Sequence, residues 1–238
     1  MQILKVFEKK LRNMNYSDNT IKIYKHFVLQ FLNEISYNDP YQIPLKSVVN
    51  FIENKIFTSI TQQNQYISSL KLFSKYILKR KLLHINKIER PRKNKSLPKI
   101  IDKEFLIYKI STINNLKHKT IISLTFSTGI RVSEVCNLKI TDIDSKKMVI
   151  YIKNSKNNKD RIVPLSENIL NMLRKYYILY KPNEYLFNGQ KSLKYSHSSC
   201  NKIVKKYIGD KYHFHQLRHS NATTLLEEGT DLRIIQKL

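Results

Sequence analysis

The apolar residues among the first ninety positions recur every three or four places, which is the period of an amphipathic helix. Ser17 or Asp18 can cap the second of these patterns, and Pro44 can occupy the first turn of the third. Four helices joined by short links predict a small bundle with one apolar core. The apolar positions that define the helices fall within residues 3–14, 21–35, 44–56 and about 59–80.

A basic stretch from Ile88 to Lys99 separates this pattern from the next one. It contains two prolines and five Lys or Arg residues, so we expect an extended linker without a core of its own. The linker can lie along a polyanion or serve as a plain surface connection. We therefore divide the chain into a helical domain over residues 1–87, a linker over residues 88–99 and a second domain over residues 100–238.

The second domain combines helices with one pair of strands. Asp102 can cap its first helix, and the nearly apolar residues 120–127 predict a buried helix that Gly129 can end in a left-handed conformation. Residues 148–153 and 161–165 alternate like strands, with turn residues between them. Further helices are expected from 167 to about 177, over about 196–208, from His215 to Gly229, and over 232–238. The expected fold is mainly α with a small β-sheet or hairpin.

The charge of the chain favours a polyanionic partner. Lys and Arg outnumber Asp and Glu by 43 to 18 in 238 residues, which gives a net charge of +25. A Lys- and Asn-rich translation of AT-rich DNA would produce the same bias. Lys75 and Lys79 load the end of the fourth helix, and Arg92, Lys93 and Lys95 load the linker. These five are our candidates for contact with nucleic acid, with a solvated surface as the alternative for each.

The sequence shows no sign of a membrane or secreted protein. It lacks a run of about 18 apolar residues, and its N-terminus lacks the apolar core and cleavage site of a signal peptide. Cys136 and Cys200 form no C-x-x-C pair. We interpret them as reduced core cysteines of a cytoplasmic protein.

The residues best suited to chemistry lie in three separate stretches. Arg131 follows the buried helix, and Glu134 is within its reach on the next turn; a structural Arg–Glu pair is the alternative. His215 and Arg218 are three positions apart and share one face near a helix N-terminus, where anions bind readily. Lys156 lies near the tip of the basic hairpin, where a solvated loop lysine is the simpler interpretation.

Together these side chains suit metal-free chemistry on a phosphodiester. Two guanidinium groups can hold the phosphate and stabilise a pentavalent transition state. His215 and Lys156 suit the tasks of proton acceptor and proton donor, and a tyrosine would be a sensible nucleophile. A metal site competes, because His215 and His219 have the spacing of zinc ligands. However, Gln216 stands where the zincin pattern needs a glutamate.

At these stretches the sequence resembles the tyrosine recombinases of the phage integrase family, most closely the Xer type. TGIRVSE from Thr128, KNNKDRIVPL from Lys156 and HQLRHSNATTLLEEGTDLRIIQKL from His215 are similar to three boxes of that family. SDNTIKIY from Ser17 resembles the start of its N-terminal domain. The resemblance implies a SAM-like core-binding domain of four helices followed by an α+β catalytic domain. It implies that Arg131, Lys156, His215 and Arg218 are catalytic, with Glu134 and His219 in support and Lys159 as second candidate for the lysine.

The resemblance also implies a function. The enzyme would be a site-specific DNA recombinase or integrase that works through a covalent 3′-phosphotyrosine and a Holliday junction. Its partners would be double-stranded DNA with a specific recombination site and a homo- or hetero-tetramer of recombinases. No metal or nucleotide cofactor is implied. Which DNA sequence it uses, and whether it integrates, excises or resolves chromosome dimers, does not follow from the residues.

One departure concerns the nucleophile. In the family a further His or Trp and the tyrosine follow the last helix, so here both are expected beyond Leu238. Tyr212 precedes the H-x-x-R box and does not match that context. The chain thus resembles a recombinase that lacks its last few tens of residues. Two alternatives are a DNA-binding relative without cleavage activity and a type IB topoisomerase-like enzyme that relaxes supercoils.

Overall fold

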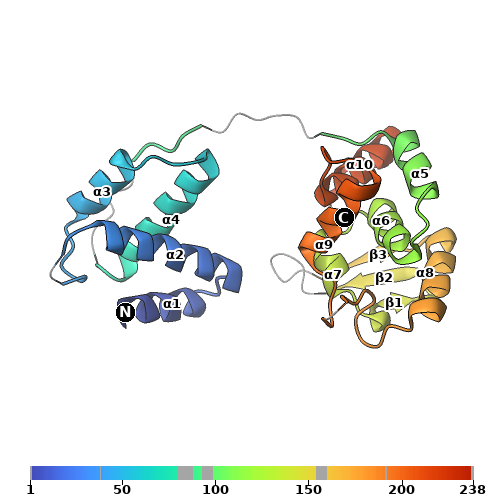
Figure 1. Ribbon diagram of the computed structural model, residues 1–238, viewed down its shortest axis with the longest axis horizontal. Coiled ribbons are helices and arrows are strands. Elements are labelled where there is room, and N and C mark those ends of the chain that lie inside the picture. The colour runs from blue at the N-terminus through green and yellow to red at the C-terminus, as the bar shows by residue number, and fades with distance from the viewer. Residues whose placement is uncertain are drawn as a thin grey trace. The chain divides into compact units, whose positions relative to one another are not determined.

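A computed structural model of the chain describes residues 2–37, 39–79, 88–92, 99–153, 160–190 and 192–236. It divides the chain into two compact units, residues 1–95 and 96–238, and each unit has its own buried core (Figure 1). The first unit is helical, and the second combines helices with one three-stranded sheet. This confirms the predicted fold class, mainly α with a small sheet.

The first unit is a bundle of four helices, as its apolar spacing predicted. Ser17 and Ser59 begin α2 and α4, because their hydroxyl oxygens accept hydrogen bonds from backbone N–H groups in the first turn. The core is rich in aromatic rings, and Phe7 meets Phe73 edge-on with ring centroids 5.6 Å apart. The helices are α1 (Gln2–Asn13), α2 (Asp18–Glu34), α3 (Leu45–Asn54) and α4 (Ile60–Tyr76).

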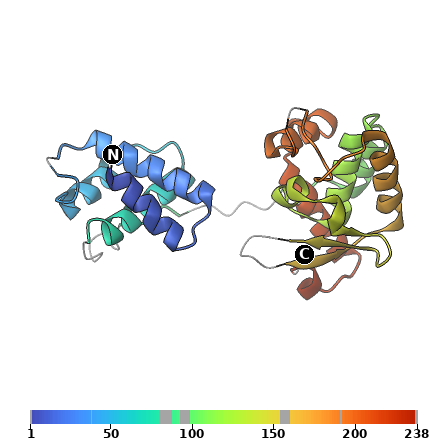
Figure 2. The same ribbon diagram turned by 90° about the horizontal axis from the view of Figure 1, so that it is seen from below.

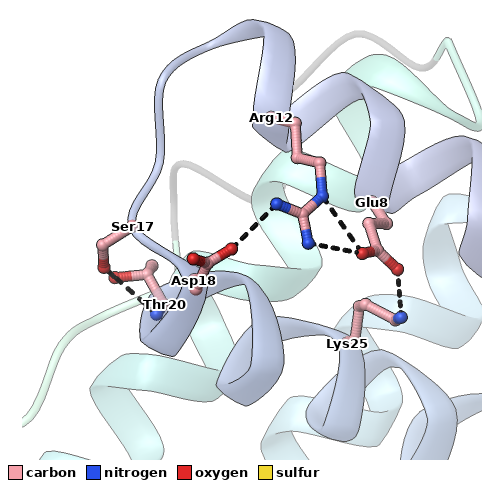
Figure 3. Close-up of polar contacts among 6 residues, drawn as sticks. All are labelled: Glu8, Arg12, Ser17, Asp18, Thr20 and Lys25. Atoms are coloured by element: carbon pink, nitrogen blue, oxygen red, sulfur yellow. Dashed lines mark hydrogen bonds and ion pairs between the residues drawn. The ribbon is translucent and has the colours of Figure 1, made fainter.

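Charged residues connect α1 to α2 on the surface of this bundle (Figure 3). Arg12 bonds Glu8 at 2.9 Å and Asp18 at 2.8 Å, and Lys25 also donates to Glu8. Exposed ion pairs contribute little to stability. The buried aromatic residues therefore supply most of the packing energy.

Two helix ends differ from the predicted ones. The third helix ends at Asn54, and Ile56 beyond it is 95% exposed instead of lying on the apolar face. The fourth was expected to reach Arg80, but α4 ends at Tyr76. The Leu78 N–H returns to the Phe73 carbonyl, and Lys79 has a left-handed φ of 51°. Ile77 and Leu78 are therefore buried by a turn instead of by a continuing helix.

Residues 88–92, from the predicted linker, lie against the first unit. Ile88 packs on its core. Arg90 donates from Nη1 to Asn64 Oδ1 and from Nη2 to Ser68 Oγ, both at 3.2 Å. At the other end of the linker, the Lys99 carbonyl accepts a hydrogen bond from α10 of the second unit. Lys93 and Lys95, two of the predicted DNA contacts, lie outside the described residues.

The second unit is built around α6 (Leu116–Thr128), which packs against α5, α7, α8, α9 and α10 (Figure 1). The helix is buried and ends at Gly129 with a φ of 63°, which confirms both predictions for this stretch. A Cβ on Gly129 would lie 2.4 Å from the Oδ1 atom of Asn221, so α10 approaches this turn closely. The other helices are α5 (Lys103–Ser111), α7 (Val132–Asn137), α8 (Glu167–Tyr180), α9 (His197–Tyr207), α10 (Phe214–Glu227) and α11 (Leu232–Ile235).

The sheet is antiparallel, in the order β1 (Ile143–Asp144), β2 (Val149–Ile152), β3 (Arg161–Pro164). β2 and β3 run side by side (Figure 2), and their ladder closes at the pair Ile152↔Arg161. The hairpin residues 154–159 between them lie outside the described residues. The H-x-x-R helix begins at Phe214, one residue earlier than predicted, and α11 ends at Ile235 within the described part of the chain.

Both cysteines are free and buried, as predicted, and their sulfur atoms lie 3.7 Å apart between α7 and α9. Across the described ranges, no helix combines the length and the apolar composition needed to cross a membrane.

Candidate active site

Arg131 and Glu134 form the predicted pair where α6 gives way to α7. Arg131 immediately precedes α7, and Glu134 lies in the first turn of that helix. The Oε1 atom of Glu134 accepts a hydrogen bond from Arg131 Nη1 at 2.8 Å, and Oε2 accepts from the Arg131 backbone N–H at 2.7 Å. The carboxylate therefore holds both ends of Arg131, while the guanidinium side chain stays 35% exposed.

A second arginine, Arg161, binds the same carboxylate from β3. Its Nη1 donates to Glu134 Oε1 and its Nη2 to Glu134 Oε2, each at 2.8 Å, which is the planar fork of a bidentate arginine–carboxylate pair. Sequence reasoning did not select Arg161 as a site residue. The strand pattern nevertheless indicates its direction: Arg161 is two and four positions before Val163 and Leu165, which are both buried, so it lies on the same inward face. An arginine on the inward face of a strand needs a charged partner.

Glu134 is ionised in this environment. Burial disfavours its charge, but hydrogen bonds from Arg161 and from the backbone and side chain of Arg131 outweigh that effect and lower its pKa from 4.5 to about 2. Its side chain is only 4% exposed. The carboxylate therefore carries a full negative charge, shared between two guanidinium groups.

His215 and Arg218 reach the same place from α10. Arg218 Nη1 donates to the carbonyl of Gly129, two residues before Arg131. Burial, followed by repulsion from Arg131 and Arg161, lowers the pKa of Arg218, and the charge of Glu134 acts in the opposite direction. These charges therefore act on one another at short range. The structure brings together Arg131, Glu134 and Arg218 from the predicted set and adds Arg161.

The surroundings of His215 favour the neutral form of its ring. Burial lowers its pKa below 6.5, and the charges of His219, Arg218 and Arg131 lower it further. The ring of His219 meets that of His215 edge-on, with centroids 4.5 Å apart. His219 also lines an apolar cavity of about 240 Å³ between α10 and α11. Among the described residues, no group of three or more His, Cys, Asp and Glu is arranged to hold a metal ion.

The structure does not place the remaining predicted site residues relative to this cluster. Lys156 and Lys159 lie outside those residues, although the ladder that leads to them closes at Arg161. Lys75, Lys79 and Arg92 are exposed residues of the first unit. Their role in DNA binding stays a prediction.

A polar cavity of about 590 Å³ opens beside Glu134. Three lysines line it, but two of them have carboxylate partners: Lys139 bonds Glu184 and Lys153 bonds Asp142, each at 2.8 Å. In the cluster formed by Arg131, Arg161, Arg218 and Glu134, by contrast, two guanidinium groups share one carboxylate, and the third, that of Arg218, bonds the nearby Gly129 carbonyl. That cluster, hereafter the arginine cluster, is the better site for an anion with several oxygens.

The chain thus combines a helical bundle with a second unit in which a small sheet and an arginine cluster suited to an anion lie together. Residues 101–238 match the model described as "Phage integrase family", and residues 3–83 match "Phage integrase, N-terminal SAM-like domain". The chain belongs to the phage integrase family. This confirms the resemblance drawn from the three boxes and the SAM-like fold expected for the first unit.

Similar proteins include Tyrosine recombinase XerA of Pyrococcus horikoshii, which is 35% identical over 99% of this chain and 84% of the relative. A solved structure of XerH site-specific recombinase bound to a difH substrate is 25% identical and has a TM-score of 0.73, covering 98% of this chain and 75% of that one. A lambda integrase tetramer bound to a Holliday junction has a TM-score of 0.76, covering 100% and 75%; at 18% identity it shows the fold alone.

Proposed function

We propose that this protein is a site-specific recombinase that cuts and rejoins double-stranded DNA through a covalent 3′-phosphotyrosine. One observation carries the proposal. Arg131 and Arg218 lie in one arginine cluster, in which Arg131 and Arg161 share a single carboxylate, beside a histidine whose pKa lies below 6.5. A phosphodiester carries one negative charge and gains a second in its pentavalent transition state, so this cluster would stabilise the transition state more than the ground state.

The side chains divide the reaction among them. The guanidinium groups of Arg131 and Arg218 would hold the non-bridging oxygens of the scissile phosphate. His215, neutral at neutral pH, would accept the proton of the attacking tyrosine hydroxyl as the tyrosine oxygen bonds to phosphorus. Lys156 would donate a proton to the 5′ oxygen as its bond to phosphorus breaks. The reverse steps, with another 5′ hydroxyl, would rejoin the strand.

The tyrosine itself is expected C-terminal to the H-x-x-R helix, which is the order that the family resemblance implies. Reading the coding DNA past codon 238 for a His or Trp followed by a Tyr tests this expectation directly. An open frame with that pair supports a complete catalytic set. A stop codon would instead favour a relative that binds DNA without cutting it.

We further propose that the protein acts on a specific DNA site as a tetramer of recombinases. The XerH structure contains a difH substrate, and the lambda integrase structure is a tetramer on a Holliday junction. For this chain the supporting features are its charge of +25 and the exposed Lys75, Lys79 and Arg92 on the helical unit. Both units would contact the DNA backbone, with the helical unit serving as the core-binding domain.

Cleavage of a nicked suicide substrate by the full-length protein is the deciding experiment. We expect Arg131→Ala and Arg218→Ala to lose several powers of ten in covalent adduct while most DNA affinity remains, because many other cations contribute to binding. Arg174→Ala on α8, an exposed arginine, is the matched control and should change neither quantity. Equal loss of binding and cleavage in the first two variants would refute the assigned roles.

The same assays separate the alternatives. Binding that falls steeply with salt and never yields an adduct would identify a DNA-binding relative without cleavage activity. Relaxation of supercoiled plasmid without a specific sequence would identify a topoisomerase-like enzyme.

A further inference from the structure

We propose that Arg161 is a positioning residue of the active site, which neutralises Glu134 and thereby leaves the positive charge of Arg131 uncompensated and available to a phosphate. The inference rests on the proposed function, because it concerns how the same site binds its phosphodiester. It assigns a task to a residue that does not itself touch the substrate.

The geometry shows which arginine neutralises the carboxylate. Arg161 places both terminal nitrogens on the two oxygens of Glu134 at 2.8 Å, whereas Arg131 gives it one guanidinium nitrogen and one backbone N–H. The Arg161 side chain is 13% exposed and the Glu134 side chain 4%, so water screens their attraction little. Arg131, at 35% exposed, keeps guanidinium N–H groups for another partner.

Arg161 is poorly placed to bind the phosphate itself. Both of its terminal nitrogens already donate to Glu134. Its Nε atom is buried and has no hydrogen-bond partner among the described residues. Each terminal nitrogen keeps one further N–H, but the side chain is only 13% exposed, so little of the group is open to a phosphate. The contact through which it can influence the substrate is therefore the one with Glu134, which in turn binds Arg131.

The charges show why two arginines are needed on one carboxylate. With Arg131 alone, Glu134 would cancel the charge that the phosphate has to meet. With Arg161 present, two guanidinium groups share one carboxylate, and one positive charge remains. The charges of Arg131, Arg161 and Glu134 all act on Arg218, the third guanidinium group of the cluster. By pairing with Glu134, Arg161 thus allows Arg131 to bind an anion although Arg131 also bonds Glu134.

The same contact fixes the base of the hairpin. Arg161 and Ile152 form the last pair of the β2–β3 ladder, and Glu134 belongs to α7. The bidentate pair therefore joins the point where the hairpin leaves the sheet to the helix that follows Arg131. We expect this join to fix the position of the first residue of β3 relative to Arg131.

His215 provides a readout that needs neither DNA nor the tyrosine. The charges acting on it come from His219 and Arg218 on its own helix and from Arg131. We expect Arg161→Gln to raise the pKa of His215, because Glu134 would then cancel the charge of Arg131. Glu134→Gln should shift it the opposite way, because it removes the negative charge. Titration of the His215 ring signals by NMR measures both.

Matched variants separate positioning from a merely structural role. Arg161→Lys keeps the charge without the fork and should leave the pKa of His215 closer to wild type than Arg161→Gln does. Arg174→Gln removes an exposed arginine from α8 and should leave it unchanged. The amide spectrum of each variant reports whether the unit is folded. If Arg161→Gln does not fold, the comparison rests on Arg161→Lys and Glu134→Gln.

Binding of inorganic phosphate, followed by the same NMR signals, tests the consequence for the anion site. We expect Arg161→Gln to weaken binding about fivefold, as loss of one partly screened charge predicts, and Glu134→Gln to tighten it. A wild-type chain that binds no phosphate would count against the proposed function, and the titration would then decide the role of Arg161 alone. The inference is overturned if folded Arg161→Gln leaves the pKa of His215 unchanged, or if the Glu134 and Arg161 variants shift it in the same direction.

Discussion

Replacing Glu134 by glutamine should change how the stability of the second unit depends on pH. The carboxylate accepts four hydrogen bonds, three of them from guanidinium groups, and its side chain is 4% exposed. Its pKa in the folded chain is about 2, against an ordinary value of 4.5. A group whose pKa is lower in the folded state stabilises that state above its ordinary pKa.

The magnitude follows from the two pKa values. A fall from 4.5 to about 2 corresponds to ~3 kcal/mol of stability, because each pKa unit is worth 1.36 kcal/mol. This contribution should be complete above pH 4.5 and should be lost as the pH falls toward 2. Glutamine cannot ionise, so Glu134→Gln should lack this part of the acid destabilisation.

Urea unfolding at a series of pH values would measure the effect. The methyl signals of Val135, which is fully buried next to Glu134, report the second unit separately from the first. At neutral pH the variant should also be less stable by about 3 kcal/mol, since it leaves the largely buried guanidinium of Arg161 and the partly exposed guanidinium of Arg131 without their counter-charge. If wild type and variant lose stability in parallel between pH 4.5 and 2, then Glu134 is not the ionised centre of this cluster.

Two further predictions concern the proposed reaction and the turn that supports it. Burial and neighbouring charges hold the pKa of His215 below 6.5. If His215 is the proton acceptor, the cleavage rate should decrease on the acid side with a midpoint below pH 6.5. A midpoint above that value would exclude this role. Gly129→Ala should destabilise the second unit by about 1–2 kcal/mol in urea unfolding, because alanine disfavours a left-handed backbone. Its Cβ would also lie 2.4 Å from Asn221 Oδ1. Because Arg218 bonds the Gly129 carbonyl, the cleavage rate of the folded variant should also fall. A variant that is less stable but cleaves at the wild-type rate when folded would show that the turn does not support catalysis.

Local patterns were sufficient for much of the fold and part of the site. The capping serines, the buried helix before Gly129, and the pairing of Arg131 with Glu134 three positions later all depend on neighbours within one or two turns. The shared helix face of His215 and Arg218 follows from spacing in the same way. Each of these features depends only on residues that are close together in the sequence, so the sequence alone predicts them.

Features that depend on distant neighbours were missed or misplaced. The partner of Arg161 lies 27 residues away in the chain, and strand alternation indicates only that the arginine points inward. Ile77 and Leu78 continue a helical spacing, yet they are buried by a turn that the rest of the bundle permits. Composition marked residues 88–92 as linker, whereas Ile88 and Arg90 use tertiary contacts with the helical unit.

The two-residue turn after α6 has a consequence for the entropy of DNA binding. Arg131 follows this turn, and Arg218, from a helix almost ninety residues later, is hydrogen-bonded to its Gly129 carbonyl. Two long, flexible side chains are thus held in place before any ligand arrives. Their conformational freedom is lost during folding, so a phosphate that binds between them need not order them again. The separation of the two guanidinium groups is a preorganised property of the folded chain, independent of which DNA sequence it meets.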